Sequence, residues 1–508
     1  MIIGTKATSK GKDLYPYQIE AIDKIFTQLE ENSEKEKYNL LFQLPTGGGK
    51  TVIFSEIARR FVYNRNKKVV ILTHRIELCK QTSKMLNEFG VNSMVINSKV
   101  KKLPTDKEYF CYVAMVETLN NRLNDEDIKM ENIGLVIVDE AHYNSFTKLF
   151  KFFKSGVMLG VTATPLSSNI NQPMKRNYEH LIVGESIPAL VEKGYLAKAN
   201  YYRYNVGLTA LKIGSHGDYT VSSSERLYAD SGMQIKLLQA YQERALGKKT
   251  LIFNNGIKTS RQVYINFKEA GYAIEHLDNT TPSQERLRIL NWLKNTPDAI
   301  VTSVSILTTG FDEPTVESII LNRATRSLTL YFQMIGRGSR VLPYKKEFDV
   351  IDLGNNIARF GPWDGEIDWL KVFRNPDYYL QNIISDEDLE RDFDYEMPAN
   401  MKELFANTTE FNFDIYKSYE QVMRAGLKPH AVLEKSMEQH LTMIKENSHD
   451  LLSARQLARA LEGDVIHRVK KFAHCITKST FNYKKWLVED YMSKLLAKTS
   501  YIDFDSED

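Results

Sequence analysis

A glycine-rich loop followed by lysine and threonine is the part of this chain with the clearest chemistry. It reads Leu44-Pro45-Thr46-Gly47-Gly48-Gly49-Lys50-Thr51. Glycines let backbone N–H groups close around phosphate oxygens, and the helix N-terminus that follows adds a positive dipole end. Lys50 can reach a β- or γ-phosphate, and the Thr51 hydroxyl can hold Mg²⁺. The loop therefore predicts a site for a nucleoside triphosphate; a plain glycine-rich turn is the alternative.

Two adjacent carboxylates follow an apolar run and form a second centre. Residues 135–138 are Leu-Val-Ile-Val, and Asp139 and Glu140 come next. In an open α/β sheet, ligands bind at the carboxyl ends of the strands, so both acids are expected at such an edge. Asp139 can orient Mg²⁺, and Glu140 can take the proton of an attacking water. Two acids that only cap a strand end are the alternative.

A pair of arginines on a glycine turn forms the third centre. Arg337 and Arg340 stand three residues apart, with Gly336 and Gly338 beside them. An arginine that faces a phosphate site from across a cleft neutralises charge that develops at the γ-phosphate. A planar guanidinium suits this task better than an ammonium group. The alternative is a basic turn at the surface.

Two series of alternating strands and helices are expected to position these centres. Strands are predicted at 40–44, 68–73, 110–115, 134–139 and 157–162, with helices at 51–64, 76–89 and 143–153. The pattern restarts near residue 248, with strands at 249–254, 273–277, 299–303, 317–321 and 349–353 and helices at 258–271, 282–294 and 328–336. Such alternation indicates parallel sheets covered by helices, so the predicted fold class is α/β with two tandem domains.

Changes in pattern give four expected segments. The first α/β domain takes residues 1–165, and an irregular linker or insertion takes 166–235. The second α/β domain takes 236–385. After an acidic stretch the periodicity becomes helical, which predicts a mainly helical accessory domain at 386–508.

Composition narrows the class of protein. The chain has 508 residues, 43% of them apolar, and a net charge of +3, so any nucleic-acid site has to be a local patch. Only three cysteines occur, far apart, which indicates a reducing compartment and argues against a cysteine zinc site. No apolar run approaches a membrane span or a signal peptide. We therefore expect a cytoplasmic protein without a membrane partner.

The order of motifs resembles the superfamily 2 helicases, with Asp-Glu-Ala-His as the second motif. Residues 14–18 (Leu-Tyr-Pro-Tyr-Gln) resemble the glutamine motif that contacts adenine, although the family usually has arginine where Tyr15 stands. Residues 71–78, 113–119, 160–165, 251–255, 305–312 and 333–340 are similar to the remaining motifs in family order. The resemblance covers roughly residues 14–361.

This resemblance implies two RecA-like domains, hydrolysis of ATP with Mg²⁺, and specific residues for each task. Catalysis would use Glu140, Gln333, Arg337 and Arg340. ATP would be held by Gln18, Thr46, Gly47, Gly48, Gly49, Lys50, Thr51, Gly310 and Asp312, and Mg²⁺ by Thr51 and Asp139. The nucleic-acid backbone would be gripped by Arg75, Thr118, Thr162, Thr308 and Arg326.

Within the superfamily, residues 44–51, 73–78, 310–314, 323–327 and 352–356 are most similar to the RadD-like and type III restriction helicase-subunit group. The chain lacks the C-terminal cysteine cluster that RadD-like proteins often carry. Three functions stay open: a DNA helicase or translocase for repair or recombination, the motor subunit of a restriction or phage-defence nuclease, and an RNA helicase. The expected partner is nucleic acid, with DNA favoured over RNA, together with a nuclease or repair protein.

The helical C-terminal part combines basic and aromatic residues. Its basic residues are Arg455, Arg459, Arg468, Lys470, Lys471, Lys478, Lys484 and Lys485, and its aromatic residues are Phe472, Phe481, Tyr483 and Trp486. The pattern fits an accessory duplex-binding module, or a helical bundle with buried aromatics and solvated lysines. Residues 453–458 look like the capped start of a small helix-turn-helix, with the cap at Ser453. Of the two interpretations we favour the bundle.

Overall fold

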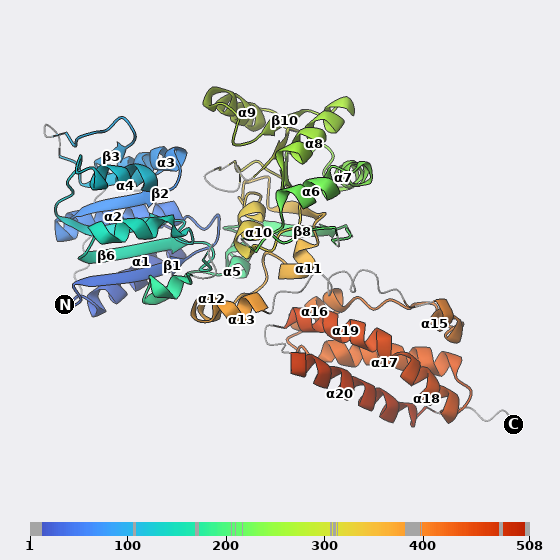
Figure 1. The fold of residues 1–508 in the computed structure, drawn as a ribbon. Helices are drawn as coiled ribbons and strands as arrows, with labels where there is room; N and C mark the ends of the chain where they lie inside the picture. Colours follow the sequence, from blue (N-terminus) through green and yellow to red (C-terminus); the bar gives the residue numbers. More distant parts are fainter. Residues whose placement is uncertain are drawn as a thin grey trace. The chain divides into compact units, whose positions relative to one another are not determined.

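The computed structural model describes residues 13–104, 108–167, 172–204, 206–208, 210–215, 217–304, 307, 311, 313–381, 397, 399–476 and 481–502. The chain divides into two compact units, Met1–Ile383 and Ile384–Asp508 (Figure 1). The first unit holds two α/β lobes, each built on its own sheet.

The first lobe is built on a seven-stranded parallel sheet in the order β3-β4-β2-β5-β6-β1-β7. The strands are β1 (Lys37–Gln43), β2 (Lys68–Thr73), β3 (Ser93–Ile96), β4 (Cys111–Met115), β5 (Ile133–Asp139), β6 (Gly156–Thr162) and β7 (His180–Val183). The helices are α1 (Pro16–Glu31), α2 (Lys50–Arg65), α3 (Ile76–Glu88), α4 (Val116–Asn124) and α5 (Ile187–Glu192), with short 3₁₀ helices at Asn144–Phe152 and Met174–Arg176.

Both faces of this sheet are buried. On β2, Val69 and Ile71 belong to one apolar cluster, whereas Val70 and Leu72 belong to another. Successive side chains of a strand point to opposite faces, so each face has its own core. Parallel sheets require such cover, which is why these strands read as continuous apolar runs.

The second lobe is built on a six-stranded parallel sheet in the order β10-β11-β9-β12-β13-β8. Its strands are β8 (Lys198–Arg203), β9 (Thr250–Asn254), β10 (Ile274–Leu277), β11 (Ile300–Ser303), β12 (Ser318–Asn322) and β13 (Glu347–Asp352). The helices that follow β8 are α6 (Val221–Tyr228), α7 (Ser231–Arg244), α8 (Ile257–Glu269), α9 (Ser283–Asn295), α10 (Leu328–Ile335), α11 (Asn356–Phe360), α12 (Trp369–Arg374) and α13 (Pro376–Gln381).

The segment predicted as an irregular insertion, 166–235, differs from that expectation. It supplies the edge strand β7 to the first sheet and the edge strand β8 to the second. Later in the chain, α12 packs back against β7 of the first lobe. Both lobes therefore include strands from the segment between the predicted borders at 165 and 236. The first lobe also packs against a helix that follows the second sheet in the chain.

The second unit is helical, as predicted. Its helices are α15 (Ala399–Leu404), α16 (Ile415–Arg424), α17 (Ala431–Asn447), α18 (Leu451–Ala460), α19 (Glu462–Cys475) and α20 (Phe481–Thr499). Helix α18 starts earlier than expected, because Asp450 rather than Ser453 is its cap and accepts from the Ser453 N–H over 2.6 Å. The acidic stretch before α15 lies outside the described residues.

Two of the predicted basic and aromatic residues are interior residues of this unit. Arg468 is only 2% exposed and pairs with Asp464 over 2.5 Å, and Phe472 is buried in the apolar core. Trp486 stays half exposed and stacks on Tyr483. Arg468 therefore stabilises the bundle from within, which fits the bundle interpretation for that residue.

Candidate active site at the phosphate loop

The phosphate loop joins β1 to α2 and has a backbone that requires glycine. Gly47 and Gly49 have φ angles of +93° and +84°, in the left-handed region. A Cβ on Gly49 would lie 2.5 Å from Gln18 Nε2, and one on Gly47 would lie 2.7 Å from Leu196 Cδ2. Gly48 is enclosed by Leu44, so side chains are excluded along the whole turn. The Gly48 N–H donates to the Pro45 carbonyl oxygen over 3.0 Å, and the amides of Gly47 and Gly49 can line a compact anion site, the geometry expected of a phosphate cradle.

The glutamine motif at the start of α1 is held against this loop. The Tyr17 hydroxyl donates to the Gly48 carbonyl oxygen over 2.9 Å, and Gln18 Oε1 accepts from the Tyr15 N–H over 3.0 Å. Tyr195, which sequence reasoning missed, packs on Tyr15 and Tyr17 with ring centroids 4.5 and 5.0 Å away. An aromatic cluster therefore stands where the family usually places an arginine.

Lys50, Asp139 and Glu140 form a buried charge cluster beside the loop. Burial lowers the pKa of Lys50, and the two carboxylates oppose that shift. Burial, together with the neighbouring Glu140, raises the pKa of Asp139 to about 7. Burial also disfavours ionised Glu140, but the charge of Lys50 outweighs it, so the pKa of Glu140 lies below its usual range. Glu140 is therefore the ionised member of the pair and the better proton acceptor.

Glu140 also has a backbone that a non-glycine residue rarely adopts. Its φ angle is +51°, and its N–H donates to Asp139 Oδ1 over 3.0 Å. Its buried Oε2 lies 3.4 Å from His142 Nδ1. Among the described residues, neither this Oε2 nor the buried Thr46 Oγ1 has a hydrogen-bond partner. Strained backbone and unsatisfied buried oxygens concentrate at functional sites. These two oxygens and the glycine cradle fit a polar ligand with bound Mg²⁺ and water.

His142 connects this cluster to the second lobe. The Thr162 hydroxyl donates to the Thr164 carbonyl oxygen over 2.9 Å, so it accepts from His142 Nδ1 over 3.0 Å. The other ring nitrogen, Nε2, then accepts from Gln333 Nε2 over 3.3 Å. Burial lowers the pKa of His142 to about 4, which keeps the ring neutral and agrees with this tautomer.

The arginines of the second lobe reach the same centre. Arg340 Nη1 donates to the Gly47 carbonyl oxygen over 2.6 Å. Arg337 Nη1 donates to the Phe311 carbonyl oxygen, and its charge lowers the pKa of Glu140. The structure thus brings Gln333, Arg337 and Arg340 to the phosphate loop and the two carboxylates.

The residues predicted to grip nucleic acid have mixed positions. Arg75 caps α3 and Thr118 lies in the first turn of α4, at the carboxyl ends of the neighbouring strands β2 and β4. Both are half-buried, as is Arg326. Thr162 does not fit the prediction, because it has no exposed surface and its hydroxyl bonds to His142. Thr308, with Gly310 and Asp312 of the ATP prediction, lies outside the described residues.

Three polar contacts near these residues were not predicted from the sequence. Asp218 accepts from the Thr325 hydroxyl over 2.7 Å and from the Arg326 N–H over 2.8 Å, and so holds the turn that carries Arg326. Arg286 of α9 donates to Glu77 of α3 over 3.2 Å, which joins the two lobes. Partners this distant in sequence leave no local signal.

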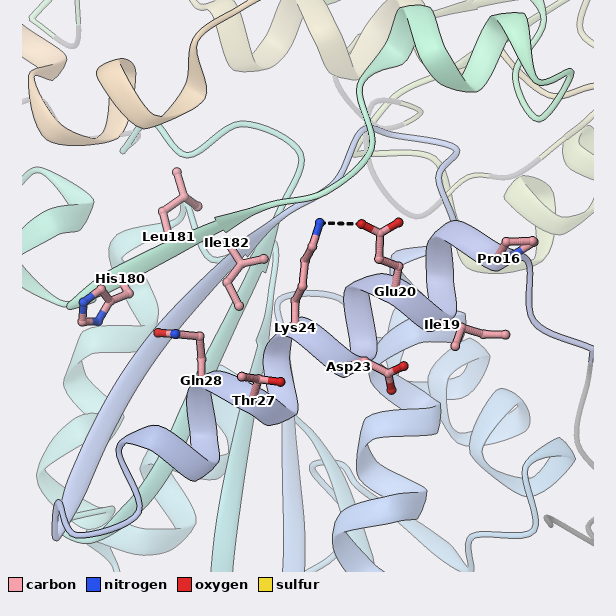
Figure 2. A pocket seen from close by; sticks show the side chains of 10 residues that line it. All are labelled: Pro16, Ile19, Glu20, Asp23, Lys24, Thr27, Gln28, His180, Leu181 and Ile182. Atoms are coloured by element: carbon pink, nitrogen blue, oxygen red, sulfur yellow. Dashed lines mark ion pairs between the residues drawn. The ribbon is translucent and has the colours of Figure 1, made fainter. Parts of the chain in front are cut away.

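A groove of about 800 Å³ lies elsewhere, between α1 and the edge strand β7. Figure 2 shows its lining, which includes Ile19, His180 and Ile182 and the ion pair of Lys24 with Glu20 over 2.7 Å. None of its lining residues belongs to the predicted nucleotide or nucleic-acid set, so the candidate site stays at the phosphate loop.

Comparison with known families supports the two lobes separately. Residues 11–167 match the family described as type III restriction enzyme, res subunit. Residues 233–341 match the helicase conserved C-terminal domain. Among the described residues, none of the helices combines the length and apolar character needed to cross a membrane.

The curated relatives are of two kinds, helicases and restriction-enzyme subunits. A 51.5 kDa Lactococcus phage protein is 28% identical over 66% of this chain and 69% of its own length. The ATP-dependent helicase IRC3 of Saccharomyces cerevisiae is 27% identical over 67% of this chain and 51% of its own. The Escherichia coli type I restriction enzyme EcoAI endonuclease subunit is 24% identical over 65% of this chain. The match covers 44% of the EcoAI subunit. The chain therefore spans about half the length of both the yeast helicase and the EcoAI subunit.

Solved structures share the fold. An HsdR subunit fragment of a type I restriction enzyme from Vibrio vulnificus superposes with a TM-score of 0.55 at 20% identity, over 69% of this chain and 67% of that one. The type ISP restriction-modification enzyme LlaBIII, bound to DNA, gives 0.53 at 15% identity, over 96% of this chain and 40% of that one. At these identities, the likeness concerns the fold.

Proposed function

We propose that the chain is a superfamily 2 helicase related to the restriction-enzyme Res group, and that it uses ATP hydrolysis to move along a DNA strand. The observation that carries the proposal is the meeting of groups from both lobes at one point. Arg340 of the second lobe donates to Gly47, within the loop that leads directly to Lys50.

Each residue of the proposed hydrolysis site has a task that its surroundings support. The glycine cradle and Lys50 would hold the phosphates of ATP, while Thr51 and Asp139 would hold Mg²⁺, which supplies charge neutralisation at the phosphates. Glu140, kept ionised by Lys50, would accept the proton of the attacking water. Arg337 and Arg340 would stabilise negative charge at the γ-phosphate position.

The link through His142 provides a route from hydrolysis to lobe movement. The Gln333–His142 and Thr162–His142 bonds join α10 of the second lobe to the ends of β5 and β6 in the first. Next to them, the Thr164 hydroxyl donates to the Thr329 hydroxyl of α10 over 2.9 Å. A small change at Glu140 would therefore change the contact between the lobes, a two-state element that can drive stepping.

We further propose that Arg75, Thr118 and Arg326 contact the nucleic-acid backbone. None of the three is aromatic, so gripping of phosphates is favoured over base stacking. DNA is favoured over RNA because a relative is described as an endonuclease subunit of a type I restriction enzyme, and the restriction-modification enzyme LlaBIII is described as bound to DNA. Binding through phosphates predicts an affinity that falls steeply with salt.

A second candidate follows from the same relatives. The similarity to type I and type III restriction subunits favours a motor that works beside a nuclease. Within the described residues, there is no group of three or more His, Cys, Asp or Glu side chains that could hold a metal. We therefore assign the cutting step, in this candidate, to a partner protein.

Hydrolysis measured in parallel with single-stranded DNA, duplex DNA, forked DNA and RNA tests the proposal. We expect the greatest stimulation with DNA that offers a single strand. Equal rates with and without every nucleic acid would contradict a translocase, and stimulation by RNA alone would replace DNA as the substrate. Co-purification of a nuclease with the tagged chain would favour the second candidate.

A further inference from the structure

Lys345 is a buried lysine that the proposed mechanism does not use. Only 3% of it is exposed, yet its ammonium group forms no hydrogen bond to a carboxylate of the described residues. Instead it donates to three carbonyl oxygens: Gly338 over 2.6 Å, Arg340 over 2.8 Å and Pro314 over 3.1 Å. A buried ammonium group is costly, so a site that satisfies all three of its donors requires an explanation.

The three carbonyls belong to two separate segments. Gly338 and Arg340 lie in the turn that carries the arginine pair, Arg337 and Arg340. Pro314 lies in the segment just before β12. The same two segments meet again where Arg337 donates to the Phe311 carbonyl oxygen. Lys345 is therefore a second tie between them, placed on the backbone side of the arginine turn.

The arginine turn has few backbone acceptors left to water. The Ser339 carbonyl oxygen accepts from the Ala197 N–H over 2.8 Å, and the Gly336 carbonyl oxygen accepts from the Ser339 hydroxyl over 2.9 Å. Lys345 takes the Gly338 and Arg340 carbonyls. Gly338 itself has no room for a side chain, because a Cβ would lie 2.2 Å from Phe348 Cδ2. The turn is thus fixed from several sides, with Lys345 at its centre.

We propose that Lys345 is a positioning residue that clamps the arginine turn to the segment before β12 and so sets where Arg337 and Arg340 stand against the phosphate loop. The effect of this clamp on turnover rests on the ATP hydrolysis proposed above. Within the described residues, Lys345 forms no hydrogen bond with the phosphate loop, Asp139 or Glu140, so it acts through the arginines.

Protonation should matter for such a clamp. Burial lowers the pKa of Lys345 to about 8; Glu317 and Glu313 oppose this shift and Arg340 adds to it. The Phe348 ring, 5.9 Å away, covers the remaining side. Since three carbonyl oxygens require three N–H donors, deprotonation near that pH removes a donor and loosens the turn. Turnover of the natural protein should therefore decline as the pH rises above about 8.

Three variants of the full-length chain test the clamp. Lys345→Met keeps the stem and removes all donors, and Lys345→Gln keeps an amide that can serve two of the three carbonyls. Lys346→Met, at the exposed neighbouring position, is the matched control. We expect kcat to fall about 10²-fold in Lys345→Met, as for a small misplacement of catalytic groups, and less in Lys345→Gln. Nucleotide affinity should hold within about twofold, and the alkaline decline should vanish in Lys345→Met.

Hydrogen exchange measured by mass spectrometry gives a readout without turnover. In Lys345→Met, the amides of residues 336–342 should exchange faster, while those of β12 and β13 keep their natural rates. Faster exchange across the whole second lobe would show only a loss of stability and overturn the positioning role. Unchanged kcat, or an alkaline decline retained in Lys345→Met, would overturn it as well. If the natural protein hydrolyses no ATP, the proposed function fails, but the exchange comparison still decides the clamp.

Discussion

Arg340 and Gly47 are 293 residues apart in the chain, yet the guanidinium of one donates to the carbonyl oxygen of the other over 2.6 Å. This bond fixes an arginine of the second lobe to the turn that precedes Lys50. Gly47 and Gly49 have no room for side chains, so the bond brings the guanidinium directly against the backbone of the predicted phosphate cradle. The pair is therefore the clearest sign that one site is assembled from both lobes.

Arg340→Ala should lower kcat for ATP hydrolysis strongly, on the order of 10³-fold, as for other arginines that act on a transferred phosphoryl group. Nucleotide binding should change little, because Lys50 and the glycine cradle remain. Arg288→Ala, at a half-exposed arginine that pairs with Glu285 and Glu275, is the control. Equal losses in both variants, or a tenfold weaker binding of ATP with unchanged kcat, would show that Arg340 serves another role.

His142 and Gln333 should behave as a coupled pair. Single alanine variants at either residue break the same bond, so the double variant His142→Ala/Gln333→Ala should lose less than the sum of the two. We expect a coupling energy of about 0.5–3 kcal/mol, calculated from kcat with nucleic acid present. The pair of His142→Ala with Arg288→Ala should be additive. Additivity in the first cycle would remove His142 from the route between the lobes.

The second unit should lose stability in acid because of a buried network around His440. Asp464 accepts from Arg468 over 2.5 Å and from His440 Nε2 over 2.7 Å, while Tyr491 donates to His440 Nδ1 over 3.0 Å. Burial lowers the pKa of His440 from 6.5 to about 4. A depressed histidine pKa means that the unfolded chain binds the proton first, so the free energy of unfolding falls as the pH drops from about 6.5 to about 4.

The shift in the pKa of His440 corresponds to a loss of about 3 kcal/mol in the free energy of unfolding of the second unit. Hydrogen exchange in α17 and α20 of the full chain measures it as a function of pH. His440→Gln keeps a donor toward Asp464 and an acceptor for Tyr491 but does not titrate, so its dependence on pH should be shallower. Burial also lowers the pKa of His467 to about 4, so part of the effect should remain. The same dependence in both proteins would assign it to other groups.

The fold and the centre of the site could be predicted because their signals are local. The sequence segments that form β2, β5 and β6 are apolar on both faces. The three glycines followed by Lys50 specify both the turn and the start of the helix after it. Short edge strands gave no such signal: β3 and β7 have four residues each and are only partly buried.

Residues whose partners are distant or are backbone atoms were the ones missed or misassigned. Thr162 ends a strand at the ligand edge, which is equally consistent with a surface contact and with its actual bond to buried His142. Asp218 and Lys345 bind groups that the sequence does not place near them, and the acceptors of Lys345 are carbonyls that every residue carries. Only coordinates bring such partners together.

Comparison of the natural protein with Glu140→Gln tests the central claim most directly. The measurement is the rate of ATP hydrolysis at saturating ATP and Mg²⁺, with and without single-stranded DNA, beside nucleotide affinity measured separately. We predict hydrolysis that single-stranded DNA accelerates in the natural protein. In the variant, kcat should fall at least about 10²-fold, with nucleotide affinity retained. Turnover by Glu140→Gln at the natural rate, or no hydrolysis by the natural protein under any of these conditions, would contradict the account.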